Sequence, residues 1–301
     1  MLRHFLNISD VSAAELQQVL ALGDAPKHTL GAPLLGEGVA LIFEKPSNRT
    51  RQSMEMAVVQ LGGHPVYTRG EEVGFDVRES VEDVTRIMQG YHRVLAARVF
   101  DHSVVERMAA VSEVPVVNLL SDHSHPLQAL ADALTMMQEW GSVRDRTIAY
   151  VGDFNNVARS LSQTCVMLGA HMRLGCPAGF DASDADLSSI AEMGTGTIKQ
   201  YVDPETAVVG AHAVHTDTWI SMGQEEQKAE RREIFAAYQV TGKLMATASA
   251  SAIFMHCLPA YRGFEVSAEI IDGQRSRVMQ QGHNRMHAAR GLLAFLLGVR
   301  P

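Results

Sequence analysis

The chain alternates short apolar runs with segments of helical periodicity, and it does so in two successive series. The first series starts with the apolar run at residues 39–43, and the second starts with the run at residues 147–151. Such alternation is typical of parallel strands, because a parallel connection crosses over through a helix. The polar residues 141–146 separate the two series, and 301 residues are more than one ordinary core accommodates. The sequence therefore predicts an α/β fold of two Rossmann-like domains, each with a parallel sheet.

Residues 43–51, Phe-Glu-Lys-Pro-Ser-Asn-Arg-Thr-Arg, connect the first apolar run to a helix. Ser47 and Asn48 belong to the residue types that commonly cap helices. Backbone N–H groups at the helix start would then face one point, together with hydroxyl groups and two arginines. This arrangement predicts a phosphate site, with a plain helix start beside a solvated arginine as the alternative. The glycines of a nucleotide-binding loop are missing.

Composition excludes several classes of function. The net charge of −8 and the lack of a basic tract argue against nucleic acid as the main partner. The three cysteines lack CxxC spacing, so neither a disulfide framework nor a zinc site is indicated. No apolar run reaches the roughly 18 residues of a membrane span, and the N-terminus has no signal-peptide pattern. We therefore expect a cytoplasmic protein without membrane contact.

Polar clusters recur where predicted strands end. In parallel sheets ligands bind beyond the carboxyl ends of the strands, so we expect a site in the cleft between the domains. Two residues of these clusters, His125 and Cys257, also have a purely structural interpretation, because a single His or Cys at the end of a strand is often simply buried. The clusters are residues 47–50, Arg98, residues 125–128, residues 155–156, residues 217–222 and residues 257–258.

Five segments together resemble the ornithine carbamoyltransferases, in that family's order and spacing. The resemblance covers nearly the whole chain, and the Asp-x-x-x-Ser-Met-Gly stretch distinguishes the ornithine branch from the aspartate branch. The segments are Ser47-Asn48-Arg49-Thr50-Arg51, His125-Pro126-Leu127-Gln128-Ala129-Leu130-Ala131-Asp132, Gly152-Asp153-Phe154-Asn155-Asn156, Asp217-Thr218-Trp219-Ile220-Ser221-Met222-Gly223-Gln224-Glu225 and His256-Cys257-Leu258-Pro259-Ala260.

The resemblance implies roles for individual residues. The carbamoyl phosphate site would consist of Ser47, Asn48, Arg49, Thr50, Arg98, His125, Gln128, Cys257, Leu258 and Arg285. The ornithine site would consist of Asn156, Asp217, Ser221 and Met222. The catalytic residues would be Arg98, His125, Asp217 and Cys257.

The resemblance also implies the reaction and its setting. The carbamoyl group would pass from carbamoyl phosphate to the δ-amine of ornithine, without a covalent intermediate, metal or organic cofactor. Residues 1–140 with a returning helix at 284–301 would bind carbamoyl phosphate, and residues 141–283 would bind ornithine. A homotrimer and a place in arginine biosynthesis are implied as well.

Two departures from the family pattern stand out. Family members usually carry a Gln where this chain has Glu72, within the polar residues 68–80 that we expect to form a long loop. A carboxylate there would repel a phosphate dianion unless it is protonated or turned away. Asn48 replaces the more usual Thr but can still cap and donate.

Three rival functions remain open at this stage. Carbamoyl transfer to another amine, such as putrescine, is the closest, although Asp217 argues for an α-amino acid. A catalytically weak binding paralogue is suggested by Glu72 alone. A nicotinamide dehydrogenase would need the glycine fingerprint that residues 152–156 lack.

Overall fold

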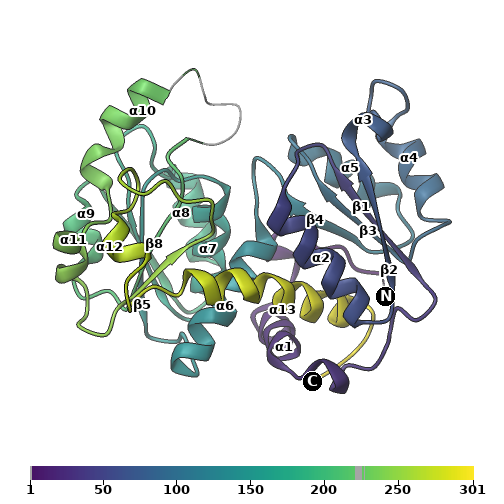
Figure 1. The fold of residues 1–301 in the computed structure, drawn as a ribbon, viewed down its shortest axis with the longest axis horizontal. Helices are drawn as coiled ribbons and strands as arrows, with labels where there is room; N and C mark the ends of the chain where they lie inside the picture. The colour runs from purple at the N-terminus through teal and green to yellow at the C-terminus, as the bar shows by residue number, and fades with distance from the viewer. Residues whose placement is uncertain (1, 221–225, 227) are drawn as a thin grey trace. The chain divides into compact units, whose positions relative to one another are not determined.

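The structure, a computed structural model, describes residues 2–220, 226 and 228–301. The chain divides into two compact units, one formed by Met1–Leu134 with His283–Pro301 and the other by Thr135–Gly282. Each unit holds one parallel β-sheet with helices packed on it (Figure 1). The predicted fold class of two parallel-sheet α/β domains is confirmed. Within the described ranges, no helix is long and apolar enough to cross a membrane.

The sheet of unit 1 has the strand order β2-β1-β3-β4. Its central strands, β1 (Gly38–Phe43) and β3 (Val94–Arg98), are almost entirely buried, as expected for strands covered by helices on both faces. The other elements of this unit are α1 (Ala13–Asp24), α2 (Asn48–Gln60), β2 (His64–Arg69), α3 (Gly70–Val73), α4 (Val81–Met88), α5 (His102–Val111) and β4 (Val116–Leu120), with 3₁₀ turns at Ile8–Asp10 and Lys27–Thr29. Helix α6 (Pro126–Trp140) begins in unit 1 and ends in unit 2.

Residues 68–80 differ from the expected long loop. Strand β2 extends to Arg69, and the next four residues form the single turn α3. Val73 and Phe75 are buried in the core of unit 1. These two apolar side chains anchor the segment at its centre. The sequence prediction was wrong here because it relied on the many charged residues of the segment.

Helix α13 (Val278–Leu296) starts six residues before the predicted position at residue 284. The only residue between these positions that disfavours a helix is Gly282, and one glycine is tolerated in a helix. Further along, α13 crosses α1, and a Cβ on Gly291 would lie 2.4 Å from the backbone N of Gly23. The two glycines thus allow close contact of the helices, which are side by side in Figure 1. This contact fixes the part of α13 that belongs to unit 1, from His283 onward.

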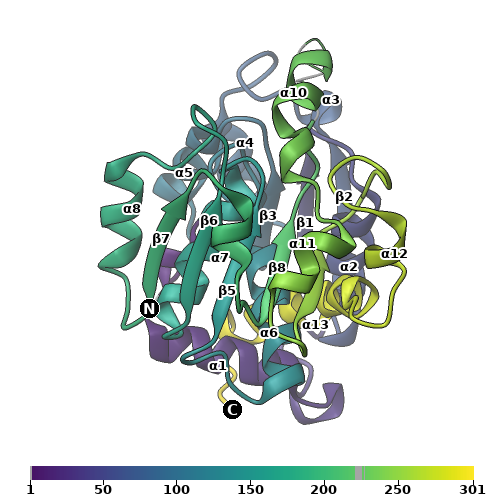
Figure 2. The ribbon, with the colours of Figure 1, turned by 90° about the vertical axis from the view of Figure 1, so that its left-hand side faces the viewer.

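The sheet of unit 2 has the strand order β7-β6-β5-β8-β9, and its strands β7, β6, β5 and β8 are labelled in Figure 2. Strand β5 (Thr147–Val151) is central and pairs in parallel with β6 (His171–Gly175) and β8 (Ala213–Thr216). The other elements are α7 (Asn156–Met167), α8 (Asp184–Ala191), β7 (Thr197–Tyr201), α9 (Pro204–Val208), α10 (Lys228–Phe235), a 3₁₀ turn (Ala236–Tyr238), α11 (Gly242–Thr247), β9 (Ile253–His256) and α12 (Ala268–Ile271).

Candidate active site

The N-terminus of α2 carries the cradle residues, Ser47 to Thr50, for which the sequence predicts phosphate binding in unit 1. Ser47 is the N-cap, and its hydroxyl accepts a hydrogen bond from the backbone N–H of Thr50 and donates to the Thr50 hydroxyl at 3.0 Å. Uncapped N–H groups and the positive end of the helix dipole favour an anion at such a terminus. The side chain of Asn48 bonds along the helix to Gln52 instead. Arg51 lies over the ring of Tyr67 and bonds to Glu55.

Two buried arginines converge on the hydroxyl of Thr50. Arg285 NH2 donates to Thr50 Oγ1 at 2.8 Å, and Arg98 NH1 lies 3.5 Å from the same oxygen. Arg285 NH1 also donates to Gln128 Oε1 at 2.7 Å. The amide of Gln128 donates in turn to Asp132 Oδ1 at 2.7 Å, which fixes the orientation of the amide. Four predicted site residues from α2, β3, α6 and α13 therefore meet at one point.

His125 immediately precedes α6 and is almost fully buried. Burial, and then the guanidinium groups of Arg285 and Arg98, hold its pKa well below the ordinary value of 6.5. The imidazole is therefore neutral at physiological pH, because a charged form would be desolvated beside two cations. A neutral imidazole can donate a hydrogen bond to a developing oxyanion without adding a charge.

Glu72, where family members usually carry a Gln, is exposed and lies 3.9 Å from Arg69. Its backbone carbonyl accepts from Arg78. The Glu72 side chain is thus part of an exposed ion pair with Arg69, and its repulsion of a phosphate stays a prediction.

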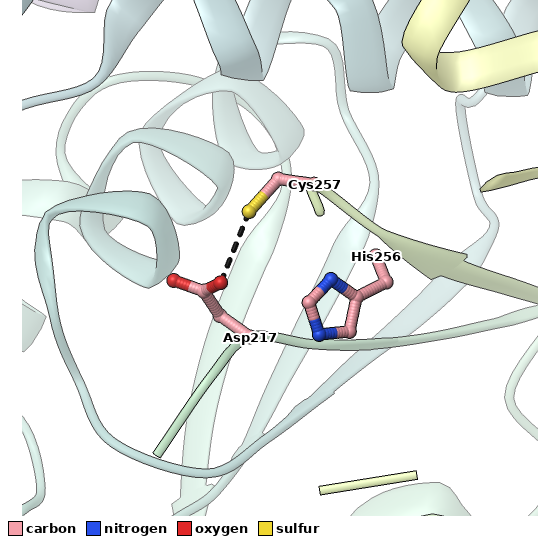
Figure 3. A group of neighbouring side chains, drawn as sticks. All are labelled: Asp217, His256 and Cys257. Atoms are coloured by element: carbon pink, nitrogen blue, oxygen red, sulfur yellow. Dashed lines mark hydrogen bonds between the residues drawn. The ribbon is translucent and has the colours of Figure 1, made fainter. Parts of the chain in front are cut away.

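Three neighbouring strands of unit 2 each end in a residue of a second cluster. The strand order β5-β8-β9 places Asn155, Asp217 and Cys257 beyond the ends of adjacent strands. Cys257 Sγ donates to Asp217 Oδ1 at 3.0 Å, as Figure 3 shows. Asn155 Nδ2 donates to Asp217 Oδ2 at 3.0 Å, while its own Oδ1 caps α7. Both oxygens of the Asp217 carboxylate are thus held in place.

The contact to Asp217 comes from Asn155, whereas the sequence prediction named Asn156. Asn155 is the N-cap of α7 and therefore has extended backbone dihedrals, while Asn156 is the first helical residue. Asn is among the favoured N-cap residues, so the capping rule alone would have singled out Asn155. The role of Asn156 in binding ornithine stays a prediction.

Asp217, His256 and Cys257 form a group whose ligand atoms lie within 4.8 Å of one another. A carboxylate, an imidazole and a thiol are donors that Zn²⁺ accepts. The sequence prediction named no metal ligand, since the cysteine spacing gave no such signal. The hydrogen bond between the thiol and the carboxylate links two of these three side chains directly (Figure 3).

Sequence reasoning also missed a buried arginine in unit 2. Arg231 donates from Nε to the backbone oxygen of Trp219 and from NH2 to Asp153. Its guanidinium lies 4.9 Å from the ring centroid of Phe180. The predicted ligands Ser221 and Met222 lie outside the described residues. Arg231 follows them in the sequence and bonds to Trp219, which precedes them.

Comparison with known proteins covers both units. The family model described as the aspartate/ornithine carbamoyltransferase carbamoyl-P binding domain matches residues 3–138. The model for the Asp/Orn binding domain of the same family matches residues 144–296.

Individual relatives agree with this assignment. An ornithine carbamoyltransferase of Hyperthermus butylicus is 45% identical over 98% of this chain and 97% of its own length. Among solved structures, the ornithine carbamoyltransferase from Pyrococcus furiosus superposes with a TM-score of 0.93 at 38% identity, covering 98% of this chain and 97% of that one. The Thermus thermophilus enzyme gives 0.90 at 39% identity, covering 99% of both chains.

The parallel-sheet units, the arginine-lined anion cradle and these matches define the class of the protein as a carbamoyl-group transferase. The chain belongs to the aspartate/ornithine carbamoyltransferase family.

Proposed function

We propose that the protein transfers the carbamoyl group of carbamoyl phosphate to the δ-amine of L-ornithine, giving L-citrulline and phosphate. The observation that carries this proposal is the convergence of Arg98 and Arg285 at Thr50, on the N-terminus of α2, with Gln128 bonded to Arg285. Two guanidinium groups and a helix terminus suit a phosphate dianion. The relatives named above are ornithine carbamoyltransferases, which supports ornithine as the acceptor.

Carbamoyl phosphate binds through its phosphate to the cradle of unit 1. The ligands are Ser47, Asn48, Arg49, Thr50, Arg98 and Arg285. His125 and Gln128 orient the carbamoyl group, and Cys257 with the backbone of Leu258 adjoins its amide end. The neutral His125 and the charged Arg98 stabilise the oxyanion that forms when the amine adds to the carbonyl carbon.

The ornithine amine must lose its proton before it attacks. An amine of this kind has an ordinary pKa of about 10.4, so neutralising it at pH 7 costs roughly 4.6 kcal/mol. A pocket with apolar walls, including Leu258 and Trp219, lowers this cost because it disfavours the ammonium. The amine nitrogen forms the new bond to carbon, the carbon–oxygen bond to phosphate breaks, and the leaving phosphate takes up the proton.

Asp217 recognises the α-ammonium group of ornithine, together with Asn156, Ser221 and Met222. Its carboxylate is held at both oxygens by Asn155 and Cys257, which aligns it before substrate arrives. A diamine without an α-carboxylate needs no such clamp. We therefore favour an α-amino acid acceptor over putrescine.

We also propose that the protein acts in the cytoplasm as a homotrimer in arginine biosynthesis. No helix within the described ranges suits a membrane, which agrees with this setting. Size-exclusion chromatography with light scattering tests the trimer directly. A stable monomer with full activity would contradict it.

The deciding experiment measures citrulline formation from carbamoyl phosphate with four acceptors in parallel: ornithine, putrescine, aspartate and N-acetylornithine. Turnover with ornithine alone supports the proposal. Turnover with putrescine instead would mean that Asp217 does not bind an α-amino group. Folded protein without turnover on any acceptor would favour a binding paralogue.

A further inference from the structure

His256 and Glu265 form a buried pair in unit 2 that the predicted site does not include. His256 ends strand β9, and Glu265 follows nine residues later in a loop. Both are about 1% exposed. His256 Nε2 lies 3.3 Å from Glu265 Oε1. A carboxylate is almost never fully buried unless it is paired, so this position needs a physical reason.

The other nitrogen of His256 faces the backbone. Nδ1 accepts a hydrogen bond from the N–H of Leu258 at 2.9 Å. Because Nδ1 accepts, the proton of the neutral ring must be on Nε2, which is the atom beside Glu265. The Glu265 carboxylate lies beside this proton, 3.3 Å from Nε2, and favours the tautomer by electrostatic attraction, without an aligned hydrogen bond.

Glu265 is itself fixed independently of His256. Its Oε1 accepts from the backbone N–H of Tyr261, and its backbone carbonyl accepts from Val240 N–H at 2.9 Å. The Glu265 carboxylate is thus the fixed end of a series of contacts that runs from Glu265 through the His256 ring to the backbone of Leu258.

Leu258 occupies a conformation that leucine rarely adopts. Its φ is +57°, in the left-handed region that favours glycine. Such a residue persists only where its surroundings hold it. The bond from Leu258 N–H to His256 supplies that restraint and uses the backbone donor of Leu258. Its carbonyl oxygen then remains as the backbone group that can meet a ligand.

We propose that Glu265 and His256 are a positioning pair that holds Leu258 so that its carbonyl oxygen accepts from the amide nitrogen of carbamoyl phosphate. The inference rests on the proposed function and adds two residues that act through Leu258 without touching substrate. Cys257 lies between His256 and Leu258 in the chain and donates to Asp217 (Figure 3), so we expect the same restraint to hold it.

Two substitutions test the two nitrogen atoms of the His256 ring separately. His256→Asn keeps an acceptor near Nδ1 for Leu258 but cannot reach Glu265. His256→Gln keeps a donor near Nε2 for Glu265 but loses the acceptor. We expect the KM for carbamoyl phosphate to rise about threefold or less in H256N and about tenfold or more in H256Q, since a lost hydrogen bond is worth about this factor. Glu265→Gln keeps an oxygen beside Nε2 of His256 and should behave like H256N. Glu265→Leu removes that oxygen and should behave like H256Q.

A second readout needs no turnover. Cys257 is partly buried, whereas Cys165 and Cys176 are buried, so iodoacetamide modification followed by mass spectrometry reports on Cys257. We expect the alkylation rate of Cys257 to rise at least about fivefold in H256Q and to stay within about twofold in H256N. If the protein were not a carbamoyltransferase, the KM difference would vanish while the alkylation difference remained.

Tyr238→Phe is the matched control for loss of a buried hydrogen bond in the same unit. The Tyr238 hydroxyl donates to Val202 O, a hydrogen bond that involves none of Glu265, His256 and Leu258. This variant should lower the melting temperature without changing KM or alkylation. Equal KM values and equal alkylation rates for H256N and H256Q would overturn the proposal, as would a Glu265→Leu variant that behaves like the wild type.

Discussion

Cys257 donates its thiol hydrogen to Asp217 across 3.0 Å, from the end of one parallel strand to the end of its neighbour. Thr216 and His256 are paired in register, so Asp217 and Cys257, which follow them, are brought together by the strand pairing alone. The thiol acts here as a hydrogen-bond donor, which is not the state of a nucleophilic thiolate.

Cys257→Ser tests whether this thiol orients a neighbour or attacks substrate. A serine hydroxyl can still donate to Asp217, so we expect kcat to stay within about tenfold of wild type. A covalent mechanism would instead lose activity by several orders of magnitude. Steady-state kinetics with both substrates varied decides between them.

Asp217→Asn should weaken ornithine binding selectively. The substitution removes the charge that pairs with the α-ammonium group, so kcat/KM for ornithine should fall on the order of 100-fold. The affinity for carbamoyl phosphate, followed by a thermal shift, should be unchanged. An equal loss for both substrates would indicate a disturbed strand end instead of a lost contact.

Arg285→Met should raise the KM for carbamoyl phosphate by on the order of 100-fold, because the proposed phosphate site loses one of its two guanidinium groups and the bonds that hold Gln128 and Thr50. Arg290→Met on the same helix is the control. Arg290 bonds to Gln60 and to the backbone of Gly23 and Ala25, so its loss should lower stability and leave KM unchanged. Phosphate-induced thermal shifts provide a measurement that does not need turnover.

His125 makes the stability of the folded chain depend on pH. Its pKa in the folded state is well below 6.5, so below pH 6.5 the unfolded chain binds a proton that the folded chain does not. Stability therefore falls as the pH drops, by up to about 1.4 kcal/mol per pH unit. Urea unfolding at pH 8 and pH 5 should show a smaller loss in His125→Gln than in the wild type. An equal loss in both proteins would mean that His125 is protonated when folded.

Metal removal should leave activity unchanged, since arginines supply the charge that a Lewis acid would supply. Dialysis against a chelator followed by the citrulline assay checks this. Stoichiometric metal in the purified protein, together with loss of activity on dialysis, would assign the group of Asp217, His256 and Cys257 as a functional metal site.

The strand-end rule explains why much of the site was predictable. Ser47, Arg98, His125 and Asp217 each follow or end a run that the sequence marks as a buried strand. In a parallel sheet these ends share one edge, so local pattern is enough to group them within a unit. Ser12 and Ser80 cap α1 and α4 in the same local way, since serine is a favoured N-cap residue.

The missed features depend on packing between distant segments. The neutral state of His125 follows from burial beside two arginines that enter from other elements. The pairing of His256 with Glu265 depends on a loop that folds back by nine residues, and the burial of Phe75 depends on the core around it. Periodicity within a segment carries no information about such contacts.

The bond between Arg285 and Thr50 joins residues 235 positions apart. At a synthesis rate of roughly 5–20 residues per second, the ribosome adds that length in roughly 12–47 seconds. For most of that interval a nascent chain carries the start of α2 and Arg98 but not the guanidinium of Arg285. Tight capture of phosphate is therefore a property that the polypeptide acquires late in translation, so free phosphate or carbamoyl phosphate in the cell has little means of trapping an unfinished chain.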